Sequence, residues 1–165
     1  MKRLLVVSAI FALAAPAFSQ GMSPQKAFEY LKKLAGTWEM KGPSGESMRV
    51  IYKVTGAGSS LIETQFPGEA HEMVSVYHMD GKDLMMTHYC AAGNQPTLRY
   101  KPGKESNILF FDFVRGSNMK PTDMHIHSAK YFIGSNANEV RSDWIGWSNG
   151  KYAATTSFEL KRAQK

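Results

Sequence analysis

The hydrophobic and polar positions of this chain follow two different periods. Between Pro24 and Gly36 the apolar residues recur every three or four positions, which predicts one short helix. Ser23 stands where an N-cap is preferred, and Pro24 follows it in the first turn. After Gly36 the period falls to two, which is typical of strands with one dry face and one wet face. The apolar positions of the helix are Ala27, Phe28, Leu31 and Leu34.

Short strands are predicted along the rest of the chain, separated every eight to twelve residues or so by Gly, Pro, Asn and Asp. Sequential hairpins leave two exposed edges unless the sheet closes on itself. The pattern therefore predicts an all-β fold, a closed up-and-down antiparallel β-barrel of about 8–10 strands with one short N-terminal helix. The predicted strands are Thr37–Lys41, Ser47–Thr55, Ser60–Phe66, His71–Met79, Asp83–Cys90, Thr97–Lys101, Asn107–Val114, Asp123–Ile133, Asn138–Trp147 and Lys151–Lys161.

The start of the chain has the three-part layout of a signal peptide. A basic pair precedes the apolar run Leu4–Leu13, and small residues lead to Ser19. The run is about ten residues long, too short to span a bilayer as a helix. We predict a signal peptide at residues 1–19 and a single barrel domain at residues 20–165, exported to the periplasm or secreted. The chain has no Asn-x-Ser/Thr acceptor, which favours a bacterial source.

The composition and charge of the chain restrict the kinds of partner that we expect it to bind. The net charge is +6, but Lys and Arg are scattered along the chain rather than clustered, so we expect no nucleic-acid partner. No later stretch approaches the roughly 18 apolar residues of a membrane helix, so we expect no transmembrane segment. Cys90 is the only Cys, so no intrachain disulfide stabilises the fold. The sequence indicates no oligomeric state.

A short motif links the helix to the first strand. The segment Leu34–Trp38, in which the strand begins Gly-x-Trp, resembles the opening of the calycin superfamily, which includes lipocalins, fatty-acid-binding proteins and nitrobindins. The segments Tyr77–Gly81 and Thr87–Pro96 are similar to those of a group of small exported bacterial lipocalin-like proteins of unknown function. The resemblance runs roughly from Phe28 to Arg162 and implies the barrel more than any activity.

The resemblance also implies roles for individual residues. In lipocalins the motif Trp closes the barrel floor beneath a basic residue of the last strand, and Trp38 and Arg162 occupy comparable places as a structural pair. Nitrobindins bind haem through a His close to the chain end. This sequence has no His after His127, so the haem assignment does not carry over and the cofactor is unknown.

Two pairs of candidate metal ligands are spaced two residues apart: His88 with Cys90, and His125 with His127. Residues i and i+2 of a strand share a face. If both pairs faced inward, four donors suited to zinc or copper would converge, with or without an enzymatic role. The alternative is that these His residues are polar members of the wall or cavity lining, and that Cys90 is a small buried residue. No nucleophile, base and acid can be assembled from spacing, so nothing positive indicates an enzyme.

The turn of the hairpin at Asp80-Gly81 determines on which face of the sheet His88 lies. The apolar pattern favours a three-residue turn, which leaves Ser75 and Tyr77 outside and His88 inside. The inner row is then Val74, Val76, His78, Leu84, Met86 and His88. The facing of His125 and His127 stays open. Strand carboxylates such as Glu63 are interpreted as outer-face charged pairs, the commoner arrangement.

The leading hypothesis is a binding module that holds a small apolar or amphipathic molecule inside the barrel. The predicted ligand-binding residues are Tyr52, His88, Cys90, Asn94, Phe111, His125, His127 and Trp144. The metal site is the second hypothesis. A third is a filled barrel with a structural or interaction role.

Overall fold

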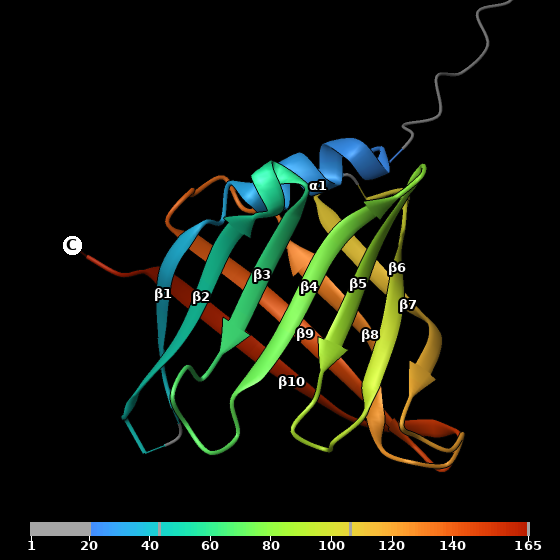
Figure 1. Cartoon of the computed structure of the whole chain (residues 1–165). Helices are drawn as coiled ribbons and strands as arrows, with labels where there is room; N and C mark the ends of the chain where they lie inside the picture. The colour runs from blue at the N-terminus through green and yellow to red at the C-terminus, as the bar shows by residue number, and fades with distance from the viewer. Residues whose placement is uncertain (1–20, 43, 106, 165) are drawn as a thin grey trace, which may run out of the picture.

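The computed structural model describes residues 21–42, 44–105 and 107–164, which form a closed antiparallel barrel (Figure 1). Each strand pairs with its neighbours in sequence, and the first pairs with the last. The predicted fold class is confirmed. The elements are α1 (Pro24–Lys32), β1 (Gly36–Lys41), β2 (Ser47–Thr55), the 3₁₀ turn η1 (Gly56–Gly58), β3 (Ser60–Gln65), β4 (Met73–Asp80), β5 (Asp83–Tyr89), β6 (Gln95–Lys101), β7 (Ile108–Ser117), β8 (His125–Phe132), β9 (Glu139–Ser148) and β10 (Lys151–Arg162).

Helix α1 lies across one end of the barrel (Figure 1). The Ser23 hydroxyl accepts a hydrogen bond from the Lys26 N–H at 3.4 Å, as an N-cap does. Phe28 and Leu31 are buried against the barrel, so the helix closes this end. No helix of the described residues is long and apolar enough to cross a membrane. The signal peptide predicted at residues 1–19 lies outside the described residues.

The seam that closes the barrel is short. In it Trp38 of β1 pairs with Arg162 of β10, and Glu39 pairs with Lys161. The guanidinium carbon of Arg162 lies 4.3 Å from the centre of the Trp38 ring system, a cation–π contact. Arg162 thus covers one face of the first aromatic side chain in the sheet.

Arg162 and Trp38 also bind the carbonyl groups that follow α1. Arg162 donates to the carbonyl oxygens of Ala35 at 2.9 Å and Lys33 at 3.3 Å. Trp38 Nε1 donates to the carbonyl oxygen of Leu34 at 2.7 Å. Carbonyl groups at a helix C-terminus lack intrahelical partners. The seam therefore fixes the end of the helix as well as the two strands.

Aromatic side chains fill the middle of the barrel. The ring centre of Phe111 lies 5.8 Å from those of Tyr77 and Tyr100 and 6.2 Å from that of Tyr131. Tyr131 packs in turn on Trp144 at 6.1 Å. These separations are those of rings in direct contact. The interior around Phe111 is therefore occupied by side chains.

The register of β4 with β5 corrects the prediction from sequence. Asp80 pairs with Asp83, so the turn has two residues and not three. Gly81 has φ +57°, as tight hairpin turns require. Ser75 and Tyr77 consequently face inward and are fully buried, and the prediction that they lie outside is wrong. The inner row does contain Leu84, Met86 and His88, whereas Val74, Val76 and His78 belong to the outer face.

Candidate functional site

A carboxylate lies inside the barrel. Glu63 of β3 has no exposed surface. Its Oε2 accepts hydrogen bonds from the hydroxyls of Tyr77 at 2.5 Å and Tyr131 at 2.7 Å, and its Oε1 accepts one from Gln65 Nε2 at 3.0 Å. The hydroxyl of Tyr52 is buried without a hydrogen-bond partner among the described residues. The interpretation of Glu63 as part of an outer-face pair is wrong.

Burial controls the ionisation of this cluster. Burial raises the pKa of Glu63, and the hydrogen bonds from Tyr77 and Gln65 partly offset that rise. Burial first, and then the Glu63 charge, raise the pKa values of Tyr52, Tyr77 and Tyr131 well above 10. The three phenols are therefore neutral at pH 7, and those of Tyr77 and Tyr131 donate hydrogen bonds to the carboxyl group. The arrangement is a hydrogen-bonded link between β3, β4 and β8 within an apolar core.

His88 lies inside the wall near the opposite end from α1. Its Nδ1 is 2.9 Å from Ser75 Oγ, and its ring centre is 5.0 Å from that of Trp144. Burial lowers the pKa of His88 to about 4. The imidazole is therefore neutral at pH 7.

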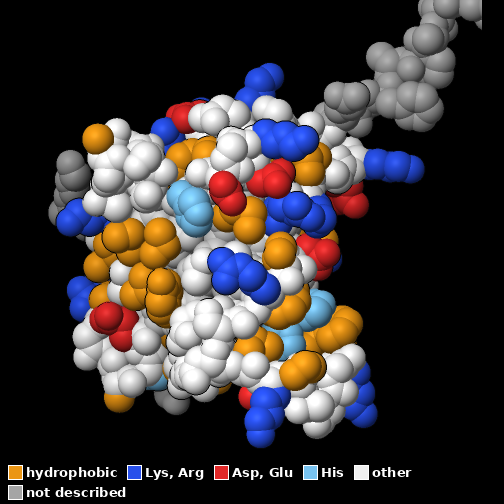
Figure 2. Space-filling model, turned by 45° about the vertical axis from the view of Figure 1, so that its right-hand side comes forward, with side chains coloured by type: hydrophobic (Ala, Val, Ile, Leu, Met, Phe, Trp, Pro, Cys, Tyr) orange, Lys and Arg blue, Asp and Glu red, His pale blue; other side chains and the backbone are white. Residues whose placement is uncertain are grey.

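The ends of β7, β8 and β9 that are remote from α1 form a hollow of about 330 Å³. Its lining includes the apolar side chains of Phe113, Met119 and Trp147 together with His125 and His127. Figure 2 shows His side chains next to hydrophobic ones low on the right of the face that it draws. This hollow combines apolar surface with imidazole nitrogen atoms, which is typical of small-molecule sites.

A β-bulge in β8 places His127 in the hollow. The register with β9 shifts between Ile126 and Ser128, so His127 is the extra residue. Its ring is stacked between Trp147, at 3.8 Å and 10°, and Phe113, at 5.1 Å and 16°. Both faces of the imidazole are therefore covered, and only its edge is left for polar contacts.

Hydrogen bonds determine which edge nitrogen of His127 carries a proton. His125 Nδ1 lies 2.8 Å from the carbonyl oxygen of Asp123, which can only accept, so this nitrogen carries a hydrogen. His125 Nε2 in the neutral ring then accepts, and its partner at 3.1 Å, His127 Nδ1, donates. The Nε2 of neutral His127 is consequently a bare acceptor. Burial and then the neighbouring His125 lower the pKa of His127, against an opposing effect of Asp112.

The predicted ligand-binding residues fall into three regions. Asn94 is buried where the β5–β6 and β7–β8 connections meet. Its Nδ2 donates to the Met124 carbonyl oxygen at 2.7 Å, and its Oδ1 has no partner among the described residues. Cys90 is half-buried in the turn that ends at Asn94, whose carbonyl oxygen accepts its N–H at 3.0 Å. Tyr52, His88, Phe111 and Trp144 lie inside the wall, and His125 and His127 line the hollow.

The four alternative metal ligands do not gather into one site. Within the described part of the chain no three or more His, Cys, Asp or Glu side chains are placed to hold a metal ion. His125 and His127 adjoin each other, whereas His88 is bonded to Ser75 and Cys90 Sγ accepts from the Ala92 N–H at 3.5 Å. A zinc or copper centre built from these residues is therefore not favoured.

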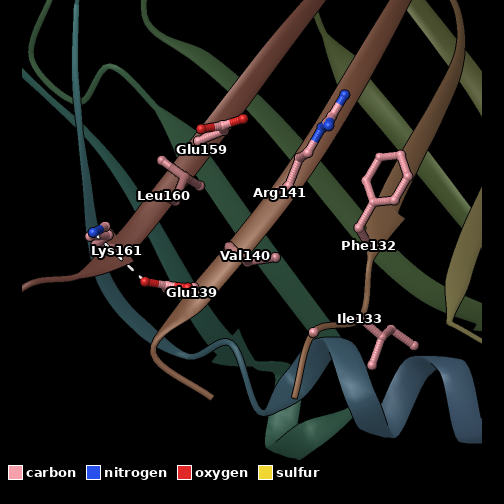
Figure 3. A pocket seen from close by; sticks show the side chains of 9 residues that line it. Phe132, Ile133, Glu139, Val140, Arg141, Glu159, Leu160 and Lys161 are labelled. Carbon is pink, nitrogen blue, oxygen red and sulfur yellow. Dashed lines mark ion pairs between the residues drawn. The ribbon is translucent and has the colours of Figure 1, made fainter. Parts of the chain in front are cut away.

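Another hollow, of about 430 Å³, lies over β8, β9 and β10 near α1 (Figure 3). At its rim Lys161 Nζ and Glu139 Oε1 are 3.7 Å apart, and both side chains are largely exposed. The Arg141 guanidinium carbon lies 4.8 Å from the centre of the Phe132 ring. Exposed ion pairs contribute little and carry no directed chemistry, so the hollow at His127 is the better candidate.

Sequence reasoning missed the aromatic and thioether members of the hollow, Phe113, Met119 and Trp147. The available signal was their place at strand ends and in the connection beside the His125/His127 pair.

The chain matches no known family model, and no curated protein matches it. The class is therefore defined by the fold alone: a closed ten-stranded antiparallel barrel, consistent with a calycin or lipocalin-like fold.

Proposed function

We propose that this protein is an exported lipocalin-like barrel that binds a small apolar or amphipathic molecule in the hollow beside His125 and His127. The observation that carries the proposal is the ring stack Phe113–His127–Trp147, which lines a hollow of mixed apolar and polar residues and leaves the His127 Nε2 able to accept a hydrogen bond. Its volume of about 330 Å³ is in the range of small-ligand sites.

The lining favours a flat, largely apolar molecule that carries an O–H or N–H group. Ring faces bind flat apolar surfaces, and the His127 Nε2 accepts one hydrogen bond. Met119 has an unbranched, flexible side chain, which adapts to irregular ligands. Lys120 and Arg115 also line the hollow and are able to meet a polar or anionic end of the molecule.

We place the ligand in this hollow rather than among Tyr52, Phe111 and Trp144. A ligand at Phe111 would have to displace rings that are already in contact, and removing such packing costs several kcal/mol, about 3–5 for a buried aromatic residue. The hollow needs no such displacement. Export rests on the predicted signal peptide, which supports a periplasmic or secreted protein.

Binding of anilinonaphthalene sulfonate, an amphipathic aromatic probe, tests the proposal. We expect saturable binding by the native protein, and a loss of about tenfold in affinity for Trp147→Ala because one wall of the hollow is removed. Tyr89→Ala is the matched control, since Tyr89 is an exposed aromatic residue outside the hollow. Absence of saturable binding, or equal losses in the two variants, would overturn the assignment. Native mass spectrometry of freshly purified protein then identifies the natural ligand.

A further inference from the structure

Among the described residues, no strand lies beside one edge of β10 over most of its length. Along its other edge β10 pairs with β9 from Lys151 to Lys161. On the β1 side the described residues give only two pairs, at Arg162 and Lys161. Beyond them β1 and β10 part, and a hollow of about 250 Å³ lies between Met40 and Glu159.

The free part of this edge is exposed and uncharged. Every residue from Lys151 to Ser157 is exposed, including Tyr152 at 60%. Between Lys151 and Glu159 the sequence is Tyr-Ala-Ala-Thr-Thr-Ser-Phe, with no charge and no Pro. Natural proteins usually protect such edges with charges, Pro or a covering segment, because an open row of N–H and C=O groups pairs with other strands.

The hydrogen bonds at the seam show which residues direct their backbone groups to the free edge. Ala163 N–H donates to Thr37 O of the β1 side, and Arg162 N–H donates to Asn138 O of the β9 side, both at 2.9 Å. Backbone groups alternate along a strand. Odd-numbered residues of the regular part of β10, namely Thr155, Ser157 and Glu159, therefore point their N–H and C=O groups to the free edge.

We propose that a second copy of this chain pairs with this edge, antiparallel, about a two-fold axis at Thr155. Two-fold antiparallel pairing of identical strands sets the same residue of both copies opposite itself at the axis. With Thr155 there, Ser157 of each copy lies opposite Ala153 of the other, and Glu159 lies close to Lys151 of the other copy. The β-bulge at Ala153 displaces Lys151 by one position, a distance that its long side chain spans.

Charge complementarity selects this register. The two-fold axis brings Lys151 of each copy close to Glu159 of the other. One such ion pair therefore forms at each end of the uncharged segment. An axis at Thr156 would instead set Glu159 against Ala153, and an axis at Ser157 would set it against Thr155, so neither forms this ion pair. The arrangement joins the sheets of two barrels into one continuous sheet, the pairing mode known as β-augmentation.

The expected interface is small. In this register the paired edge residues of each copy are Ala153, Thr155 and Ser157, which give about six backbone hydrogen bonds. An area below about 1,200 Å² is typical of weak association. We therefore expect a dissociation constant on the order of 10–100 μM, so that dimers form only in concentrated solution.

Sedimentation velocity of the purified protein, from about 1 to 500 μM, tests the proposal over the range that such an affinity requires. We expect a concentration-dependent dimer for the native chain and monomers for Thr155→Lys and Thr155→Glu, because each sets like charges against each other at the axis. An equimolar mixture of the two variants should recover the dimer. A native chain that stays monomeric at the highest concentration overturns the proposal, and so does a Thr155→Lys dimer of native strength.

Two single proline variants distinguish a loss of edge pairing from a loss of folding stability. The Thr155 N–H points to the free edge, so Thr155→Pro removes no bond to β9 and should leave the urea midpoint near the native value while abolishing the dimer. The Thr156 N–H points to β9, so Thr156→Pro should lower the midpoint strongly. Retention of the dimer by Thr155→Pro would show that β10 is not the interface.

Discussion

Arg162 donates a hydrogen bond to the carbonyl oxygen of Ala35, a residue 127 positions earlier in the chain. The same guanidinium lies over the Trp38 ring and also reaches the carbonyl of Lys33. One side chain therefore joins β10, β1 and the end of α1. Because the seam contains so few pairs, the loss of this side chain acts on the closure of the whole barrel.

We expect Arg162→Ala to lower the free energy of unfolding by about 2–3 kcal/mol, since it removes a cation–π contact and two hydrogen bonds. Arg162→Lys keeps the charge but not the planar fork, so its loss should be smaller. Urea unfolding followed by tryptophan fluorescence measures both variants. Equal losses for Ala and Lys would contradict the contribution expected from the charge, whereas a Lys variant as stable as the native protein would show that the fork geometry does not matter.

Glu63→Gln should change how stability depends on pH. Because burial raises the pKa of Glu63 above 4.5, the folded protein binds more protons than the unfolded chain above that value. As pH rises through the pKa that Glu63 has in the folded protein, this difference in proton binding lowers the free energy of unfolding. The Glu63→Gln variant has no carboxyl group at this position, so it lacks the effect. We expect the variant to gain stability relative to the native protein as pH rises from 4.5, by about 1.4 kcal/mol for each unit of pKa shift.

Glu159→Gln is the matched control for Glu63→Gln, since it removes a carboxylate from an exposed position of β10. The two variants are compared with the native protein by urea unfolding at a series of pH values. A Glu63→Gln difference that stays constant with pH would contradict the role of burial.

His88 should contribute with the opposite sign. Burial lowers its pKa from 6.5 to about 4, so the unfolded chain takes up the proton first as pH falls. The stability that this group contributes is fully present above pH 6.5 and is lost as pH falls to about 4. The native protein should lose about 3 kcal/mol relative to His88→Gln across that window. NMR titration of the His88 ring checks the pKa directly, and a midpoint near 6.5 would contradict the prediction.

His127→Phe should remove one interaction and keep the ring stack. A pair of probes that differ by one hydroxyl, naphthol and naphthalene, isolates the hydrogen bond to His127 Nε2. We expect the native protein to prefer naphthol by about five- to tenfold, which corresponds to about 1 kcal/mol, and the variant to lose that preference. Isothermal titration calorimetry of the four combinations gives the coupling. An unchanged preference would show that Nε2 does not contact the ligand.

The strands were predictable because each has one dry and one wet face. The sequence places a strand at 47–55, and β2 occupies the same residues. The facing of β4 was not predictable from alternation, since Val74 and Val76 form one apolar row and Tyr77 lies on the other face. The left-handed Gly81 settles the choice by making a two-residue turn.

The candidate site depends on features that have no simple period. The bulge at His127 reverses the alternation of β8, so Ile126 and Tyr131 both contact the core although their numbers differ in parity. Glu63 shares a face with Leu61, and Ile62 lies on the other face, so hydrophobicity alone does not select the inner one. The phenols that satisfy Glu63 come from β4 and β8, which are distant in sequence.

The short seam also has a kinetic consequence. The last strand meets the first only after the whole chain has been synthesised, and contacts between distant residues form slowly. Until then the folding sheet has two open edges, and the free segment of β10 is one of them. We expect substitutions at Arg162 to accelerate unfolding more than they slow folding, which would place closure of the seam after the rate-limiting step. Unfolding would then begin at the seam between β1 and β10, the last part of the barrel to form.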